Sequence, residues 1–135
     1  MEESTGPRIE IQVPLNPSEC SRVRRVVCCL ASAALNDPVA VGDIELAMGE
    51  AFSNAVKYGR HGLATVYVDL SRPKVLTLEM VYPGADFDTT VTYPEDVHNA
   101  SGGFGRFIMK RVLDMMDYSF EDGRTILRMR KTRRD

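Results

Sequence analysis

Two pairs of alternating segments, each joined by a tight turn, constrain the fold of this chain most. Ala64–Leu70 and Leu76–Met80 alternate apolar and polar residues on either side of the short turn Ser71–Lys74. Tyr118–Phe120 and Thr125–Lys131 flank a second short turn in the same way. Tight turns join antiparallel neighbours, whereas parallel strands need a crossover of about a dozen residues or more. The pattern therefore predicts an antiparallel or mixed sheet.

Three segments with apolar residues at helical spacing accompany these strands. The first follows Asn16-Pro17 and stops at Asn36-Asp37, the second runs from about Val41 to Tyr58, and the third covers about Phe104–Met116. A further strand is expected at Ile9–Val13. We therefore expect a two-layer α/β sandwich, with a mixed, mostly antiparallel sheet covered on one face by about three helices.

The length and charge of the chain narrow the classes of protein to consider. The 135 residues fit one compact domain, expected at residues 8–132 after a flexible tail at residues 1–7. The net charge of -2 predicts no direct binding to nucleic acid. No apolar run is long enough to span a bilayer, and the acidic N-terminus is unlike a signal peptide. We expect a cytoplasmic protein that does not bind membranes.

Cysteine and arginine clusters give weaker signals. Three cysteines lie in one helical segment, and this odd, clustered set favours free thiols over disulfides or a zinc site. The C-terminal segment is basic, and its residues are expected to form a solvated strand end or tail, with a docking patch for an acidic partner as the alternative. These basic residues are Arg128, Arg130, Lys131, Arg133 and Arg134.

One helix carries a polar stripe that suits chemistry. Glu50 and Asn54 are one turn apart, so their side chains point the same way, and Lys57 extends the stripe. An amide oxygen is a ligand that Mg²⁺ accepts, and a glutamate can accept a proton from an attacking hydroxyl. A solvated helix face without a function is the alternative for this pair taken alone.

A glycine-rich stretch leads into the third helix. Ser101-Gly102-Gly103-Phe104-Gly105 precedes the apolar helix without a gap. Glycines let a phosphate approach the backbone, and the helix N-terminus adds free N–H groups and a positive dipole end. Taken alone, the stretch is equally consistent with a flexible segment that leads into the helix.

The two stretches together resemble a known superfamily. Glu50-Ala-Phe-Ser-Asn-Ala-Val-Lys-Tyr-Gly59 is similar to the N-box of the GHKL ATP-binding proteins, which include gyrase, Hsp90, histidine kinases and MutL. Gly102-Gly-Phe-Gly-Arg-Phe-Ile-Met-Lys-Arg-Val-Leu-Asp114 is similar to the second glycine box. The small size and the ending of the chain resemble the anti-sigma-factor serine kinases in particular.

The resemblance implies a Bergerat-type fold that binds ATP with Mg²⁺. Asn54 would ligate the metal and Glu50 would be the catalytic base or orienting group. Lys57, Gly102, Gly103, Phe104 and Gly105 would belong to the nucleotide site. The substrate would be a serine of an anti-anti-sigma protein with a STAS domain, the other partner a sigma factor, and the protein a homodimer.

The first glycine box departs from the pattern that the resemblance implies. Such boxes carry an aspartate that binds the adenine amino group, but Tyr82 stands at that position here, followed by Gly84 in register. Tyr82, Gly84 and the nearby Asp86 are the candidate base-binding residues. A phenol does not offer the geometry of a carboxylate.

Two functions are therefore expected from the sequence. The first is an ATP-dependent protein serine/threonine kinase that acts as an anti-sigma regulator by partner switching. The alternative is a non-catalytic protein of the same fold that works through protein contacts, with weak or no nucleotide binding. Glu50 and Asn54 favour the first function, and Tyr82 favours the second.

Overall fold

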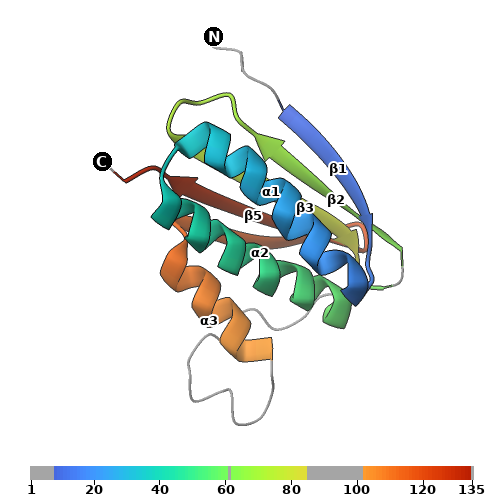
Figure 1. The fold of residues 1–135 in the computed structure, drawn as a ribbon. Coiled ribbons are helices and arrows are strands. Elements are labelled where there is room, and N and C mark those ends of the chain that lie inside the picture. Colours follow the sequence, from blue (N-terminus) through green and yellow to red (C-terminus); the bar gives the residue numbers. More distant parts are fainter. Residues whose placement is uncertain (1–7, 61, 85–101, 135) are drawn as a thin grey trace.

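The computed structural model describes residues 8–60, 62–84 and 102–134, which form one open sheet with helices on one face (Figure 1). The sheet has five strands in the order β1-β2-β3-β5-β4, and all four pairings are antiparallel. The strands are β1 (Arg8–Pro14), β2 (Leu63–Asp69), β3 (Val75–Pro83), β4 (Met115–Glu121) and β5 (Arg124–Thr132). The two-layer α/β sandwich expected from the sequence is confirmed, with a sheet that is antiparallel throughout.

The helical layer consists of three α-helices and one short turn of 3-10 helix. They are α1 (Cys20–Leu35), α2 (Pro38–Tyr58), α3 (Gly102–Val112) and the 3-10 turn Pro17–Glu19. Asn16 caps the 3-10 turn, and Asp37 caps α2 by accepting hydrogen bonds from two amides of its first turn. Asn36 ends α1 in a left-handed conformation with φ 50°, which an asparagine tolerates.

Two of the predicted boundaries are wrong. The helix expected to reach Met116 ends at Val112, and Met116 lies in β4. The apolar residues here fit both helical spacing and strand alternation: Val112, Leu113, Met115 and Met116. The end of the helix and the start of the strand could therefore not be located from the sequence. The strand expected at Leu76–Met80 runs on to Pro83, so Tyr82 lies inside β3.

The core lies between the sheet and the helices. α1 packs over β3, α2 over β5 and α3 over β4, while α1 and α3 lie on either side of α2. The apolar stripe of α2 is fully buried at Ile44, Met48 and Ala51. The central position of α2 therefore brings it into contact with both other helices and with the sheet. Within the described ranges, none of the helices is both long and apolar enough to cross a membrane.

Candidate functional site

Glu50 lies directly against the first turn of α3. A Cβ atom placed on Gly105 would be 2.7 Å from Oε1 of Glu50, so a larger residue here would displace this carboxylate. Gly102 to Gly105 begin α3, and the first four N–H groups of a helix have no partner within that helix. The two sequence stretches therefore meet in space, with a carboxylate beside the free amides of a helix N-terminus.

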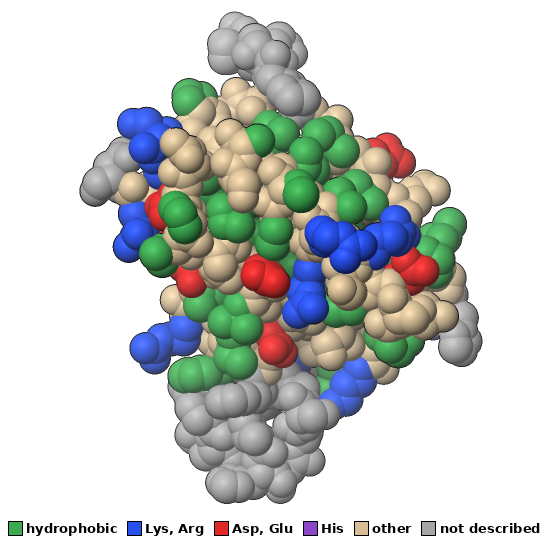
Figure 2. Space-filling view, viewed as in Figure 1, with side chains coloured by type: hydrophobic (Ala, Val, Ile, Leu, Met, Phe, Trp, Pro, Cys, Tyr) green, Lys and Arg blue, Asp and Glu red, His purple; other side chains and the backbone are tan. Residues whose placement is uncertain are grey.

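Glu50 also faces a groove between α1 and α2. It lines a cavity of about 580 Å³ together with Arg24 and Glu45. On the helical face of the molecule, Lys and Arg side chains gather over α1, with acidic side chains beside them over α2 (Figure 2). Glu50 is therefore accessible from the groove on one side while it contacts α3 on the other.

Asn54 lies one turn further along α2 and is almost completely buried. Its exposed fraction is 4%, and its Nδ2 group has no hydrogen-bond partner among the described residues. A buried polar group without a partner costs about 1–3 kcal/mol. The polar face predicted for α2 is therefore not solvated at Asn54, which excludes the simplest alternative considered for that residue.

Tyr82 and Thr125 form a second buried polar pair on the sheet. They are paired residues of β3 and β5, they are 1% and 0% exposed, and neither hydroxyl has a hydrogen-bond partner in the described structure. Burial raises the pKa of the Tyr82 phenol well above its usual value, and Tyr118 raises it further, while Thr125 and Arg106 act in the opposite direction. Tyr82 is therefore a neutral phenol at physiological pH.

Tyr118 and Arg106 connect this pair to Asn54. Burial raises the pKa of the Tyr118 phenol, and the carboxamide of Asn54 and the charge of Arg106 oppose that rise. Arg106, from the first half of α3, is 4% exposed. Asn54, Tyr82, Arg106, Tyr118 and Thr125 thus form one buried cluster, which we call the polar cluster, drawn from α2, α3 and three strands.

Sequence reasoning missed part of the polar cluster. Thr125 and Tyr118 were assigned only to strands. A hydroxyl residue at a strand position where alternation predicts a buried apolar side chain could have indicated a buried polar group. Arg106 lies next to the predicted glycine segment but was not among the predicted site residues.

Two glycines, Gly59 and Gly84, allow close packing beside Tyr82. A Cβ on Gly59 would be 2.5 Å from the carbonyl oxygen of Ala55 and 2.9 Å from the ring of Tyr82. A Cβ on Gly84 would be 3.0 Å from the Cα of Gly59. The end of α2 and the end of β3 are therefore in backbone contact. Gly84 contributes this close packing next to the candidate base-binding position.

The remaining predicted site residues have fewer contacts that fix a role for them. Lys57 is exposed, with its ammonium 5.4 Å from the centre of the Tyr58 ring. Gly102, Gly103 and Phe104 belong to the first turn of α3. Asp86 lies outside the described residues. The structure thus brings Glu50, Asn54 and Gly105 together and leaves Lys57 at the edge.

The residues fit the phosphate and metal end of Mg-ATP better than its base. The first-turn amides of α3 suit phosphate oxygens, and Asn54 offers an amide oxygen to a hard cation that keeps most of its ligands as water and phosphate. No group of three or more His, Cys, Asp or Glu side chains in the described residues is placed to hold a metal by itself. Tyr82 and Thr125 offer hydroxyls where a carboxylate was expected.

Comparison with known proteins agrees with the fold. A family model described as a histidine kinase-like ATPase domain matches residues 13–131. No curated protein matches the sequence.

Two solved structures share the architecture. The histidine kinase AdeS of Acinetobacter baumannii is 14% identical, with a TM-score of 0.52, over 70% of this chain and 48% of that one. The histidine kinase domain of the Erythrobacter litoralis EL346 blue-light activated histidine kinase is also 14% identical, with a TM-score of 0.55, over 89% of this chain and 61% of that one. The chain thus spans about half to three fifths of the length of these neighbours.

Proposed function

Because the chain belongs to the histidine kinase-like ATPase family, we propose that it is an ATP-dependent protein serine kinase that regulates a sigma factor by partner switching. Membership in this family supports binding of a nucleotide, usually with Mg²⁺, and activity of the kinase or ATPase type. The serine substrate, the anti-anti-sigma protein with a STAS domain and the sigma factor are parts of the proposal.

The contact between Glu50 and Gly105 is the observation that carries the proposal. It brings a proton acceptor beside the amides that would bind the phosphates, with Asn54 one turn away for the metal. Positioning and charge stabilisation supply most of the catalysis in phosphoryl transfer. Glu50 would accept the proton of the serine hydroxyl as its oxygen bonds to the terminal phosphorus and the bond to ADP breaks.

The groove between α1 and α2 is a suitable approach for the protein substrate. It ends at Glu50 and Ser53, and Arg24 and Leu46 line it. A serine carried by a loop in this groove would lie beside the Glu50 carboxylate. We expect substitutions in the groove to affect the protein substrate more than the nucleotide.

Titration with Mg-ATP by calorimetry tests the nucleotide part. Wild-type protein is expected to bind with a requirement for magnesium, and Asn54→Ala is expected to lose that requirement because the metal loses its protein ligand. Ser53→Ala is the matched control, since Ser53 is the preceding residue of α2 and is exposed. Absence of magnesium-dependent binding by the wild type at millimolar nucleotide would rule out the kinase.

Transfer of a labelled phosphate to a candidate anti-anti-sigma protein tests the reaction. Glu50→Gln keeps the shape of the side chain and removes the proton acceptor, so transfer is expected to fall by about 10²-fold or more with Mg-ATP affinity nearly unchanged. Equal loss of transfer and of affinity would indicate that Glu50 only shapes the pocket.

Burial of Tyr82 favours the second candidate function. The phenol is enclosed by the end of α2 and by the neighbouring strand, so the position where the resemblance places the adenine contact holds a buried phenol. A protein of this fold that binds nucleotide weakly and acts through protein contacts would show no phosphate transfer with any partner. The two experiments above separate the two functions.

A further inference from the structure

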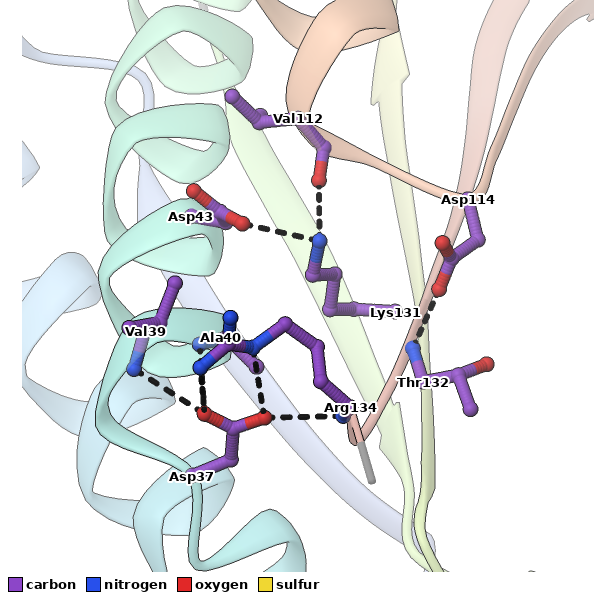
Figure 3. A network of polar contacts seen from close by, with 9 residues as sticks. All are labelled: Asp37, Val39, Ala40, Asp43, Val112, Asp114, Lys131, Thr132 and Arg134. Carbon is purple, nitrogen blue, oxygen red and sulfur yellow. Dashed lines mark hydrogen bonds and ion pairs between the residues drawn. The ribbon is translucent and has the colours of Figure 1, made fainter.

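α3 is held against α2 at both of its ends. At its first turn, Gly105 contacts Glu50 of α2. At its last residue, the carbonyl oxygen of Val112 accepts a 2.6 Å hydrogen bond from Nζ of Lys131, which also lies 2.9 Å from Oδ2 of Asp43 on α2 (Figure 3). Lys131 belongs to β5, so a single ammonium group joins one strand and both helices.

This lysine is not part of a solvated tail, contrary to the expectation for the basic C-terminal segment. Lys131 is 8% exposed, and its strand neighbour Met129 is fully buried on the same face of β5. The last carbonyls of a helix lack partners within the helix and carry the negative end of its dipole. The Lys131 ammonium therefore neutralises both the negative end of α3 and the Asp43 carboxylate. These two interactions offset the free-energy cost of burying the ammonium group.

The two contacts lie on the same side of α2. Asp43 and Glu50 are two helical turns apart in sequence, so their side chains project in nearly the same direction. A helix behaves as a nearly rigid rod over the length of α3. Its position at Val112 therefore influences its position at Gly105, where the Glu50 carboxylate lies directly against the helix.

We propose that Lys131 is a positioning residue for the nucleotide site. By fixing the C-terminus of α3 on Asp43, it keeps the first-turn amides of α3 beside Glu50, at the opposite end of the helix. Lys131 touches neither Glu50 nor Asn54 in the structure, so it acts through the placement of α3. The effect of Lys131 on nucleotide binding rests on the proposed function, whereas its effect on the placement of α3 does not.

The chain offers a matched control in the contact between Asp37 and Arg134. The Arg134 amide donates a 2.9 Å hydrogen bond to Oδ2 of Asp37, and its Nε lies 3.3 Å from the same oxygen. This contact also joins the C-terminal end of the chain, just after β5, to α2, and the Arg134 contacts drawn in Figure 3 all go to Asp37 and not to α3. Arg134→Ala therefore removes a comparable link without releasing α3.

The experiment compares Lys131→Met with Arg134→Ala and wild type. Hydrogen exchange of the α3 amides is expected to be faster in Lys131→Met and unchanged in Arg134→Ala. Affinity for Mg-ATP, measured by calorimetry, is expected to fall about tenfold in Lys131→Met and to stay within about twofold in Arg134→Ala, since a misplaced binding group loses far more than a distant substitution. Thermal unfolding of both variants shows how far each loses stability.

Two results would overturn the proposal. One is unchanged exchange throughout α3 in Lys131→Met. The other is an equal loss of affinity in both variants, which would show that stability alone controls binding. If wild-type protein binds no nucleotide, the proposed function fails, and hydrogen exchange still decides whether Lys131 positions α3.

Discussion

The beginning and the end of α2 use polar residues in opposite ways. At the beginning, Asp37 accepts hydrogen bonds from the amides of Val39 and Ala40 and pairs with Arg134, and Asp43 pairs with Lys131. At the end, Asn54 is buried with an amide group that has no partner among the described residues. One helix thus carries a satisfied polar network and an unsatisfied one.

The difference bears on where the proposed site lies. Polar groups that stabilise a fold are paired, because each unpaired buried group costs about 1–3 kcal/mol. Near the end of α2, the hydroxyls of Tyr82 and Thr125 are in the same unpaired state as Asn54. A ligand that pairs with these groups would recover that cost, and this is why we propose this end of α2 for binding.

The largest expected effect comes from Gly59→Ala, which tests how tightly the end of α2 is packed. The added methyl group would overlap the Ala55 carbonyl and the Tyr82 ring. Because backbone atoms cannot move aside cheaply, we expect a loss of about 3 kcal/mol in the free energy of unfolding, measured by urea titration. A loss smaller than about 1 kcal/mol would mean that this end is loose.

The next effect is expected at the beginning of α2 and depends on pH. Hydrogen bonding from the Arg134 amide lowers the pKa of Asp37 from 3.8 to about 2. A folded-state pKa below the unfolded value adds stability above the unfolded pKa, and that stability is lost as the pH falls through the folded pKa. Urea stability measured from pH 5 to pH 2 should therefore fall more steeply in wild type than in Asp37→Asn.

The same experiment separates the charge from the cap. Asparagine caps helices nearly as well as aspartate, so Asp37→Asn removes mainly the ionic part of the contact with Arg134. Asp122→Asn, in the exposed turn between β4 and β5, serves as the control and should follow the wild-type curve. Parallel curves for wild type and Asp37→Asn would show that the Asp37 charge contributes nothing.

Sequence patterns predicted the elements well because each of them is a local property. Helical spacing gave α1 and α2, and alternation gave β2 and β3 with their tight turn. The position of β5 between β3 and β4 was not predicted, because strand order depends on contacts between distant segments. The same holds for Lys131, which has the sequence context of a basic tail and the surroundings of a core residue.

The candidate site was predicted in part for the same reason. Glu50 and Asn54 follow from spacing along one helix, and their association with the glycine segment came from a resemblance to a family. That Gly105 touches Glu50, and that Thr125 and Tyr118 surround Tyr82, depends on how α3 and β5 pack. A single sequence carries no direct record of such packing.

Tyr82→Phe is expected to have a smaller effect, with the opposite sign to that of Gly59→Ala. Removing a buried hydroxyl that has no hydrogen-bond partner in the described part of the chain should stabilise the protein by up to about 1 kcal/mol in urea titration. The control is Tyr67→Phe on the open face of the sheet, where the ring lies under the Arg8 guanidinium at 4.4 Å. A loss of more than about 1 kcal/mol in Tyr82→Phe would show that the phenol hydroxyl is paired after all.

The smallest effect is expected on the outer surface of α2, at Gly42 in the groove between α1 and α2. A Cβ at Gly42 would meet nothing within 4 Å, so no packing demands a glycine there. Glycine inside a helix costs about 0.5–1 kcal/mol relative to alanine, and Gly42→Ala should raise the free energy of unfolding by that amount. If Gly42→Ala also slows transfer to a protein substrate while Mg-ATP affinity is unchanged, the glycine keeps the groove open at a cost in stability. In that case the proposed function also uses the outer surface of α2 near its beginning, whereas an unaffected transfer rate would leave that function to the polar cluster and Glu50.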